Sequence, residues 1–306
     1  MPLRSPRYLN KADFYAQAEY CGIPRTPKQV EYSERSSNTG GAEGKVGIYG
    51  IGGSATTTKV VEVQHAYTLE NSDKVTFSKP LDQMEKENQG FTVLPLGDGT
   101  QEDHWTTWRD AFVKVDGKLS LSPVSAVGKI MDAFRQLLAR EDVDLEALAR
   151  ISRGECTEEN PSGIMSDSQI YSVLKSVYFG NSLPDIPLLY RMTPDIQGVF
   201  DHLFISCTPG HFIGKGIAGS DALEGDATVL GTVRNLIPDD PDEGYLSTER
   251  WTLHGWDPTV RSRMRPSMDD LSETLLPTLD PSWQNHEDES FFLKGPTLVI
   301  DAVAIY

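Results

Sequence analysis

The C-terminal stretch PTLVIDAVAIY, residues 296–306, is the strongest single indication of how this chain folds. It is apolar at almost every position instead of alternating, which is typical of a strand buried on both faces of a sheet. One carboxylate, Asp301, interrupts the run between Ile300 and Ala302. Because a buried carboxylate without a partner is costly, we expect an arginine to pair with Asp301 and give it a structural role.

Further strands are expected in the first half of the chain. In residues 58–70 every second residue from Val61 to Leu69 alternates with polar neighbours, which predicts a half-buried strand. Shorter β-prone runs predict strands at residues 45–51, 74–78 and 90–96.

The segment FVKVDGKLSL, residues 112–121, contains two β-prone runs joined by Asp116 and Gly117. An Asp-Gly pair between such runs predicts a type I′ hairpin. In the last third of the chain we expect strands from Phe200 onward, at residues 228–237 and at residues 250–256.

Helices are predicted at the N-terminus and in the middle of the chain. Asn10 is a suitable N-cap for a helix that Gly22 and Pro24 end. Ser122 and Pro123 open an amphipathic helix, since apolar residues recur after them at spacings of three, four and seven. Shorter helices are expected from Asp144 to Gly154, from Ser166 to Gly180 and over residues 266–277.

This order of elements predicts an α+β fold with an antiparallel or mixed β-sheet core and a central block of amphipathic helices. Residues 1–44 are expected to form an N-terminal helix and an exposed arm, because residues 24–44 are polar and rich in glycine. Residues 45–306 then form the body, with a possible subdivision at 153–165.

The charge of the chain is strongly acidic, with a net value of −17. Such a charge repels a phosphate backbone, so general nucleic-acid binding is not expected. Residues 220–290 hold 16 acids against five arginines, whereas residues 1–36 hold six basic and four acidic residues. The basic N-terminal part could therefore bind the acidic body of a second copy.

The sequence as a whole also predicts a cellular location. No stretch has the roughly 18 uninterrupted apolar residues of a membrane helix, and the N-terminus shows no secretory signal. The three cysteines, Cys21, Cys156 and Cys207, are scattered and odd in number. We therefore expect a cytoplasmic protein that does not bind membranes.

The glycine-rich stretch GIYGIGGS, residues 47–54, resembles a phosphate-binding loop in its spacing. However, Gly53 stands where that loop needs a lysine, and the following residues favour a strand instead of a helix. We expect a turn between strands, with no nucleotide site and no cofactor.

A second candidate site lies in HLFISCTPGH, which contains His202, Cys207 and His211. Imidazole and thiolate are zinc ligands, and Cys207 with His211 could act as nucleophile and base. The spacing matches no recurrent zinc motif, so the competing interpretation is a buried cysteine with two ordinary histidines.

The third candidate is the run VRSRMR, in which Arg261, Arg263 and Arg265 alternate. In an extended segment all three would face one side. Trp251 and Trp256 lie just upstream, and Trp and Arg are enriched at interface hot spots. We expect a docking strip for an acidic protein surface, and the alternative is an internal charge ladder.

Two functional hypotheses follow. The first is a non-enzymatic structural or interaction protein that self-associates into a larger assembly, for example a shell or a capsid or virion component. The alternative is a cytosolic enzyme or small-molecule binder with a site around His202, Cys207 and His211.

Overall fold

The structure is a computed structural model. It describes residues 4–24, 29–36, 63–70, 73–86, 90–94, 108–138, 185–195, 200–213, 223–240, 244–262 and 292–306.

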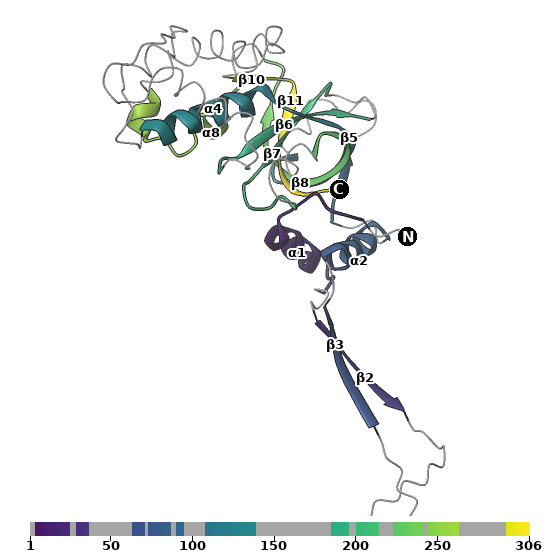
Figure 1. The fold of residues 1–306 in the computed structure, drawn as a ribbon. Coiled ribbons are helices and arrows are strands. Elements are labelled where there is room, and N and C mark those ends of the chain that lie inside the picture. The colour runs from purple at the N-terminus through teal and green to yellow at the C-terminus, as the bar shows by residue number, and fades with distance from the viewer. Residues whose placement is uncertain are drawn as a thin grey trace, which may run out of the picture.

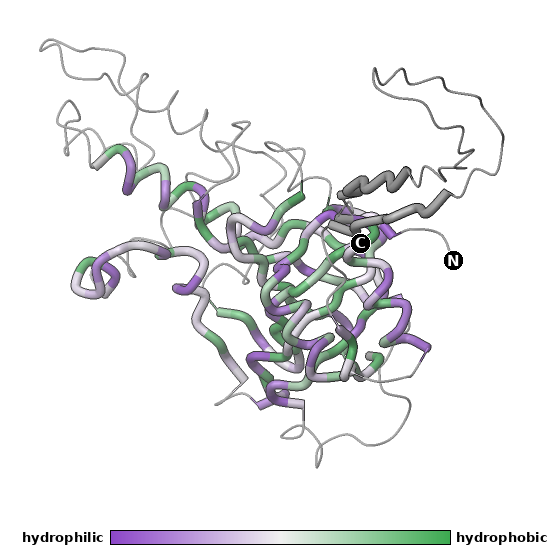
Figure 2. The backbone as a smooth tube through the Cα atoms, turned by 90° about the horizontal axis from the view of Figure 1, so that it is seen from below, coloured by the Kyte–Doolittle hydropathy of each residue, from purple (hydrophilic) through white to green (hydrophobic). Residues whose placement is uncertain are grey.

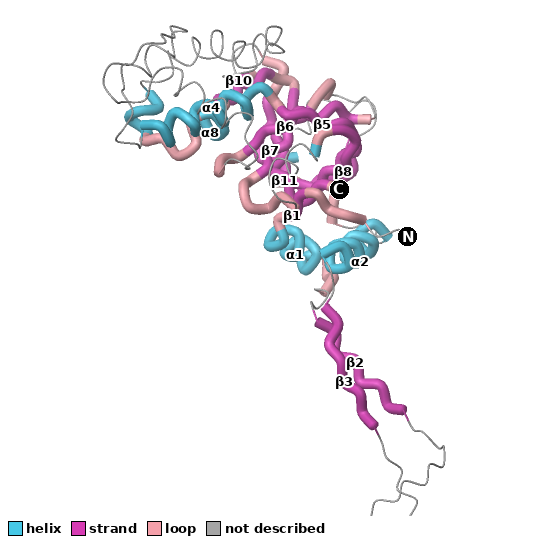
Figure 3. Tube along the Cα trace, in the orientation of Figure 1, coloured by secondary structure: helices cyan, strands magenta, loops and turns pink. Residues whose placement is uncertain are grey.

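The core of the molecule is a closed barrel of five strands (Figures 1 and 3). Its members are β5 (Phe112–Leu121), β6 (Leu188–Pro194), β7 (Leu203–Cys207), β11 (Thr297–Ile305) and β8 (Gly225–Ile237). They pair in that order, and β8 closes the ring by pairing with both β11 and β5. All of these pairs are antiparallel except β7 with β11, which is parallel.

The prediction of an α+β fold is therefore confirmed, but the expected core is wrong in detail. The strands form a small mixed barrel instead of a plain sheet with a central block of helices. The C-terminal run is strand β11, and it is buried on both faces as expected. One face of β11 lines the barrel interior, and the other is covered by helices.

The barrel interior is filled by alternating apolar residues. Figure 2 shows hydrophobic stretches alternating with hydrophilic ones along the described part of the chain. The interior residues include Val113, Val115, Leu119, Tyr190, Met192, Ile205, Cys207, Val229, Val233, Leu298 and Ile300. A five-stranded barrel is narrower than the eight-stranded ones that just accommodate a ligand. The interior is thus a packed core.

The expected hairpin at Asp116 and Gly117 is wrong, because β5 runs straight through both residues. Gly117 pairs with Pro194 on one side and with Ala227 on the other. A Cβ atom at this position would collide with the carbonyl oxygen of Thr193. Glycine is needed here for a close approach between strands and not for a turn.

Two helical layers cover the outside of the barrel. On one side, α4 (Pro123–Leu138) and α8 (Glu249–Thr252) cover a cluster around Phe204 and Val299. On the other side, α1 (Lys11–Tyr20) and α2 (Asp73–Lys86) cover a cluster around Leu230 and Val303.

The predicted N-terminal and central helices are confirmed. The side chain of Asn10 accepts a hydrogen bond from the backbone N–H of Asp13, and Gly22 follows the helix with a φ of 78°. The central helix begins at Pro123, as its sequence indicates. The expected strand at residues 74–78 is wrong, since these residues lie in α2.

The N-terminal residues are part of the body. Strand β1 (Tyr8–Leu9) pairs with the end of β11, and Tyr8 is completely buried in the barrel cluster. At the other edge, β4 (Thr92–Leu94) confirms the strand expected there and pairs in parallel with β5. The division at residue 44 stays a prediction, and the boundary expected at 153–165 lies outside the described residues.

Two small sheets are separate from the barrel. One consists of β9 (Tyr245–Ser247) and β10 (Phe292–Lys294), paired antiparallel. The other is an antiparallel ribbon of β2 (Gln29–Ser36) and β3 (Val63–Glu70), which leads away from the barrel in Figure 1. The strand expected within 58–70 is confirmed, whereas β2 lies in a segment expected to be an irregular arm.

Candidate interaction site

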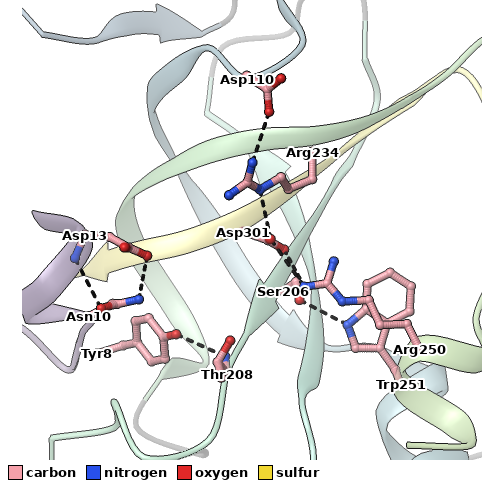
Figure 4. A network of polar contacts seen from close by, with 10 residues as sticks. All are labelled: Tyr8, Asn10, Asp13, Asp110, Ser206, Thr208, Arg234, Arg250, Trp251 and Asp301. Atoms are coloured by element: carbon pink, nitrogen blue, oxygen red, sulfur yellow. Dashed lines mark hydrogen bonds and ion pairs between the residues drawn. The ribbon is translucent and has the colours of Figure 1, made fainter. Parts of the chain in front are cut away.

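Asp301 lies at the centre of a network of charged side chains on the outside of the barrel (Figure 4). The guanidinium of Arg234 donates from Nε to Asp301 Oδ2 at 3.2 Å. Arg250 approaches Asp301 Oδ1 to 3.2 Å from the other side. Arg234 also donates from Nη1 to Asp110 at 3.0 Å. The expectation that arginine would pair with Asp301 is therefore confirmed, and the network joins β8, β11 and α8.

Trp251 and Trp256 belong to the core of the chain, because only 1% and 7% of their surfaces are exposed. The indole Nε1 of Trp251 donates to Ser206 Oγ at 3.1 Å, so the ring is fixed against β7. The guanidinium of Arg250 lies over the Trp251 ring, 5.6 Å from its centroid. The expected strand at 250–256 is wrong, since Glu249–Thr252 form α8, and neither tryptophan contributes to an exposed docking strip.

The arginine run begins in a helical turn. Residues 258–262 are helical, and Arg261 donates from Nε to the carbonyl oxygen of Trp256 at 2.8 Å. Its backbone is therefore not extended at this point. Arg263 and Arg265 lie outside the described residues, so the remainder of the strip stays a prediction.

The structure separates His202 from Cys207. His202 directly precedes β7 and Cys207 is its last residue, which at about 3.3 Å per residue places them roughly 16 Å apart. The ring of His202 packs edge-on against Phe204, whereas Cys207 faces the barrel interior. His211 lies beyond the strand, with its ring against Tyr8. In the described part of the chain, no three or more His, Cys, Asp or Glu residues are grouped to hold a metal.

The thiol of Cys207 lacks the environment of a nucleophile. It is completely buried, and this burial raises its pKa well above the ordinary value. Burial also raises the pKa of the neighbouring Tyr8, whose hydroxyl oxygen accepts a hydrogen bond from the N–H of Thr208. A reactive cysteine needs a lowered pKa and access to solvent. The geometry thus favours the interpretation of Cys207 as a core residue.

An exposed aromatic pair was missed by the sequence analysis. Tyr245 and Phe292 are 49% and 51% exposed, and their ring centroids are 6.4 Å apart. They lie on the outer face of the β9–β10 sheet, while Leu246 and Leu293 on its inner face pack against the α4–α8 cluster. The sequence contains a signal for this arrangement. Each aromatic residue directly precedes a leucine, and successive residues of a strand lie on opposite faces.

The chain matches one protein family along most of its length. The model of the Domain of unknown function (DUF6414) matches residues 28–306. The chain belongs to this family. No curated protein and no solved structure matches it.

The match places the β2–β3 ribbon, the barrel and the β9–β10 sheet in the family domain, while β1 and α1 precede it. The glycine-rich loop at 47–54 lies outside the described residues. In the described part of the chain, no helix is both long and apolar enough to cross a membrane.

The ribbon has one face that is rich in apolar residues. Successive residues of a strand lie on opposite faces, so alternate pairs of the register share a face. One face holds the pairs Val30–Leu69, Tyr32–Tyr67, Glu34–His65 and Ser36–Val63. The other holds Gln29–Glu70, Glu31–Thr68, Ser33–Ala66 and Arg35–Gln64. The ribbon is therefore amphipathic.

Proposed function

We propose that this chain is a non-enzymatic interaction protein that self-associates into a larger assembly, and that copies meet through the β2–β3 ribbon. The amphipathic register of this ribbon is the observation that carries the proposal. The ribbon is a separate sheet that joins neither the barrel nor the β9–β10 sheet.

A ribbon of two strands has little stability of its own in water. It becomes stable when its apolar face packs against another surface. The pairs Val30–Leu69 and Tyr32–Tyr67 place most of the apolar residues on one face. Figures 1 and 3 show the ribbon leading away from the barrel.

The order of pairs on this face suits a second copy of the same chain. Tyr32–Tyr67 and Glu34–His65 are neighbouring pairs, and apolar residues lie beyond each of them. A two-fold axis between the two pairs would set the tyrosine pair of one copy opposite the Glu34–His65 pair of the other. Such self-complementarity is what a two-fold interface requires.

The experiment is a measurement of native mass by light scattering after size-exclusion chromatography. In Tyr32→Lys/Tyr67→Lys, charged residues replace the central pair of the apolar face. Because burying unpaired lysines at an interface is costly, we expect the mass to fall toward the 33.9 kDa of one chain.

The matched control is Ser33→Lys/Ala66→Lys, which adds the same charges at the next pair of the register, on the other face. We expect this variant to keep the mass of the wild type. Equal masses for the two double variants would overturn the proposed role of the apolar face.

A further inference from the structure

The β2–β3 ribbon has two outer edges. Among the described residues, β2 and β3 pair only with each other, over eight residues of each strand. In an antiparallel pair, the backbone N–H and C=O groups of alternate residues point to the partner strand, and the remaining groups point away from it. Each outer edge therefore presents a row of backbone groups that is suited to bind a further strand.

The two edges differ in charge. Strand β2 contains Glu31, Glu34 and Arg35, whereas in β3 the one acidic or basic residue besides His65 is Glu70, at the end of the strand. Charged residues and proline on an edge strand oppose pairing with a further strand. Strand β3 contains neither proline nor lysine. The β3 edge is thus the better suited of the two to accept another strand.

The sequence of β3 is complementary to itself about Tyr67. When two β3 strands pair antiparallel with Tyr67 at the centre, the residues opposite each other are Tyr67–Tyr67, Ala66–Thr68, His65–Leu69 and Gln64–Glu70. None of these pairs sets like charges opposite each other, which would destabilise the sheet. Odd-numbered residues lie opposite odd-numbered ones, so each face of one ribbon continues as the same face of the other. This self-complementarity favours a second copy of the chain as the partner.

The same pairing extends the apolar face across both copies. Within one ribbon, Tyr32 lies opposite Tyr67. With Tyr67 at the two-fold axis, Tyr32 and Tyr67 of the two copies form a row of four tyrosines on one face. Aromatic cross-strand pairs stabilise antiparallel sheets. A sheet of three or more strands with an apolar face can also be stable in water, whereas two strands alone are marginal.

The direction of the ribbons agrees with this contact. The ribbon leads away from the barrel in Figure 1. Two ribbons that pair through antiparallel β3 strands point in opposite directions. The two barrels would therefore lie at opposite ends of the shared sheet.

We propose that β3 of one copy pairs edge to edge with β3 of a second copy, about a two-fold axis at Tyr67, and that the two ribbons form one four-stranded sheet. This inference rests on the proposed function, because it assumes that copies associate through the ribbon. Edge pairing joins two copies, and the apolar face of their shared sheet then packs against a second such sheet. The two contacts together lead from a dimer to a larger assembly.

The test is disulfide cross-linking in the full-length chain. In a Cys21→Ser/Cys156→Ser background, the remaining thiol is that of Cys207, which is completely buried. Adding Ala66→Cys/Thr68→Cys gives the β3 variant, in which each new cysteine lies opposite one of the second copy. Opposite Cα atoms are about 4.5–5.5 Å apart, which a disulfide spans. We expect mild oxidation to give a covalent two-chain product on non-reducing electrophoresis.

The matched control is Glu31→Cys/Ser33→Cys in the same background. These residues lie opposite Thr68 and Ala66 within the ribbon, and on the same face. In the four-stranded sheet the two β2 strands are three strand spacings apart, roughly 14 Å. We expect at least about tenfold less two-chain product than from the β3 variant, because this distance exceeds the reach of a disulfide.

Two results would overturn the edge pairing, namely equal yields from the two variants and no product from the β3 variant. If the wild type still associates in light scattering, these results leave the proposed contact between apolar faces intact. A wild type with the mass of one chain at every concentration would overturn the proposed function as well.

Discussion

Gly231 shows how strongly single residues constrain this barrel. It lies on the interior face of β8, between Val229 and Val233, where β8 pairs with both β11 and β5. A Cβ atom there would lie 2.5 Å from the Asp301 carbonyl oxygen and 2.5 Å from Ile300 Cγ2. One of these contacts is with backbone, so the neighbouring strand itself would have to move.

We therefore expect Gly231→Ala to lower the free energy of unfolding by about 2 kcal/mol, within the usual cost of overpacking a core. Urea denaturation followed by circular dichroism measures this change. Thr232→Ala, at the next residue of the same strand, is the control and should have a smaller effect. Equal stability of the wild type and Gly231→Ala would show that the barrel is less tightly closed than described.

Cys207 allows a second test at the scale of a residue. Because burial raises the pKa of its thiol, little thiolate forms near neutral pH. In a Cys21→Ser/Cys156→Ser background, we expect an alkylating reagent to modify Cys207 only when the chain unfolds. Mass spectrometry of native and urea-unfolded samples would measure this difference. Rapid modification of the native protein would support the alternative hypothesis of a reactive site.

At the scale of elements, an ionic cluster joins the N-terminal segment, α2 and β5. The carboxylate of Glu85 pairs with Arg4 and, at 2.8 Å, with Lys114 Nζ. Arg4 also lies over the ring of Tyr306, 5.3 Å from its centroid. The cluster therefore connects both ends of the chain with α2.

This cluster predicts a dependence of stability on pH. Burial alone would raise the pKa of Glu85, but hydrogen bonds from Arg4 and Lys114 outweigh it and lower the pKa below its ordinary 4.5. A lowered folded pKa adds stability above pH 4.5 that is lost as the pH falls through the folded value. We expect Glu85→Gln to be less stable than the wild type at pH 6.5, with the difference shrinking toward pH 3.

Urea denaturation across this pH range measures the difference. In an Arg4→Gln/Lys114→Gln background, the same substitution should have little effect, because the partners that lower the pKa are absent. A stability difference that does not change with pH would contradict the role given to the cluster.

The elements also show which parts of the fold could be predicted from sequence. The caps at Asn10 and Pro123 and the apolar run at 297–305 depend on local chemistry, and the structure confirms the elements that they predict. In α2 the β-prone residues VTFS, 75–78, led to the wrong prediction of a strand. The buried residues Phe77, Leu81 and Met84 follow helical spacing across a longer window than those residues cover.

The wrong predictions of the hairpin at 116–117 and of an exposed Trp251 have a different cause. The Asp-Gly pair at 116–117 is typical of a turn, but the close approach of β6 and β8 around Gly117 is a property of the closed barrel. Likewise, no local pattern shows that Trp251 lies against Ser206, 45 residues earlier in the chain. Long-range pairing decides whether such residues are core or surface.

For the whole molecule, the barrel is a packed scaffold, and we propose that the β2–β3 ribbon outside it mediates contact between copies. The amphipathic ribbon is a separate sheet outside the barrel. The N-terminal residues are part of this scaffold, since Tyr8 is completely buried and β1 pairs with β11. Under the proposed function, self-association should therefore depend on the ribbon and not on a detachable N-terminal helix.

The measurement that tests this account most directly is the native mass of the wild type by light scattering, over a range of protein and salt concentrations. We expect a mass of at least twice the 33.9 kDa of one chain that falls when the protein is diluted, since contact between copies depends on concentration by mass action. A constant mass of one chain at all concentrations would contradict the central claim.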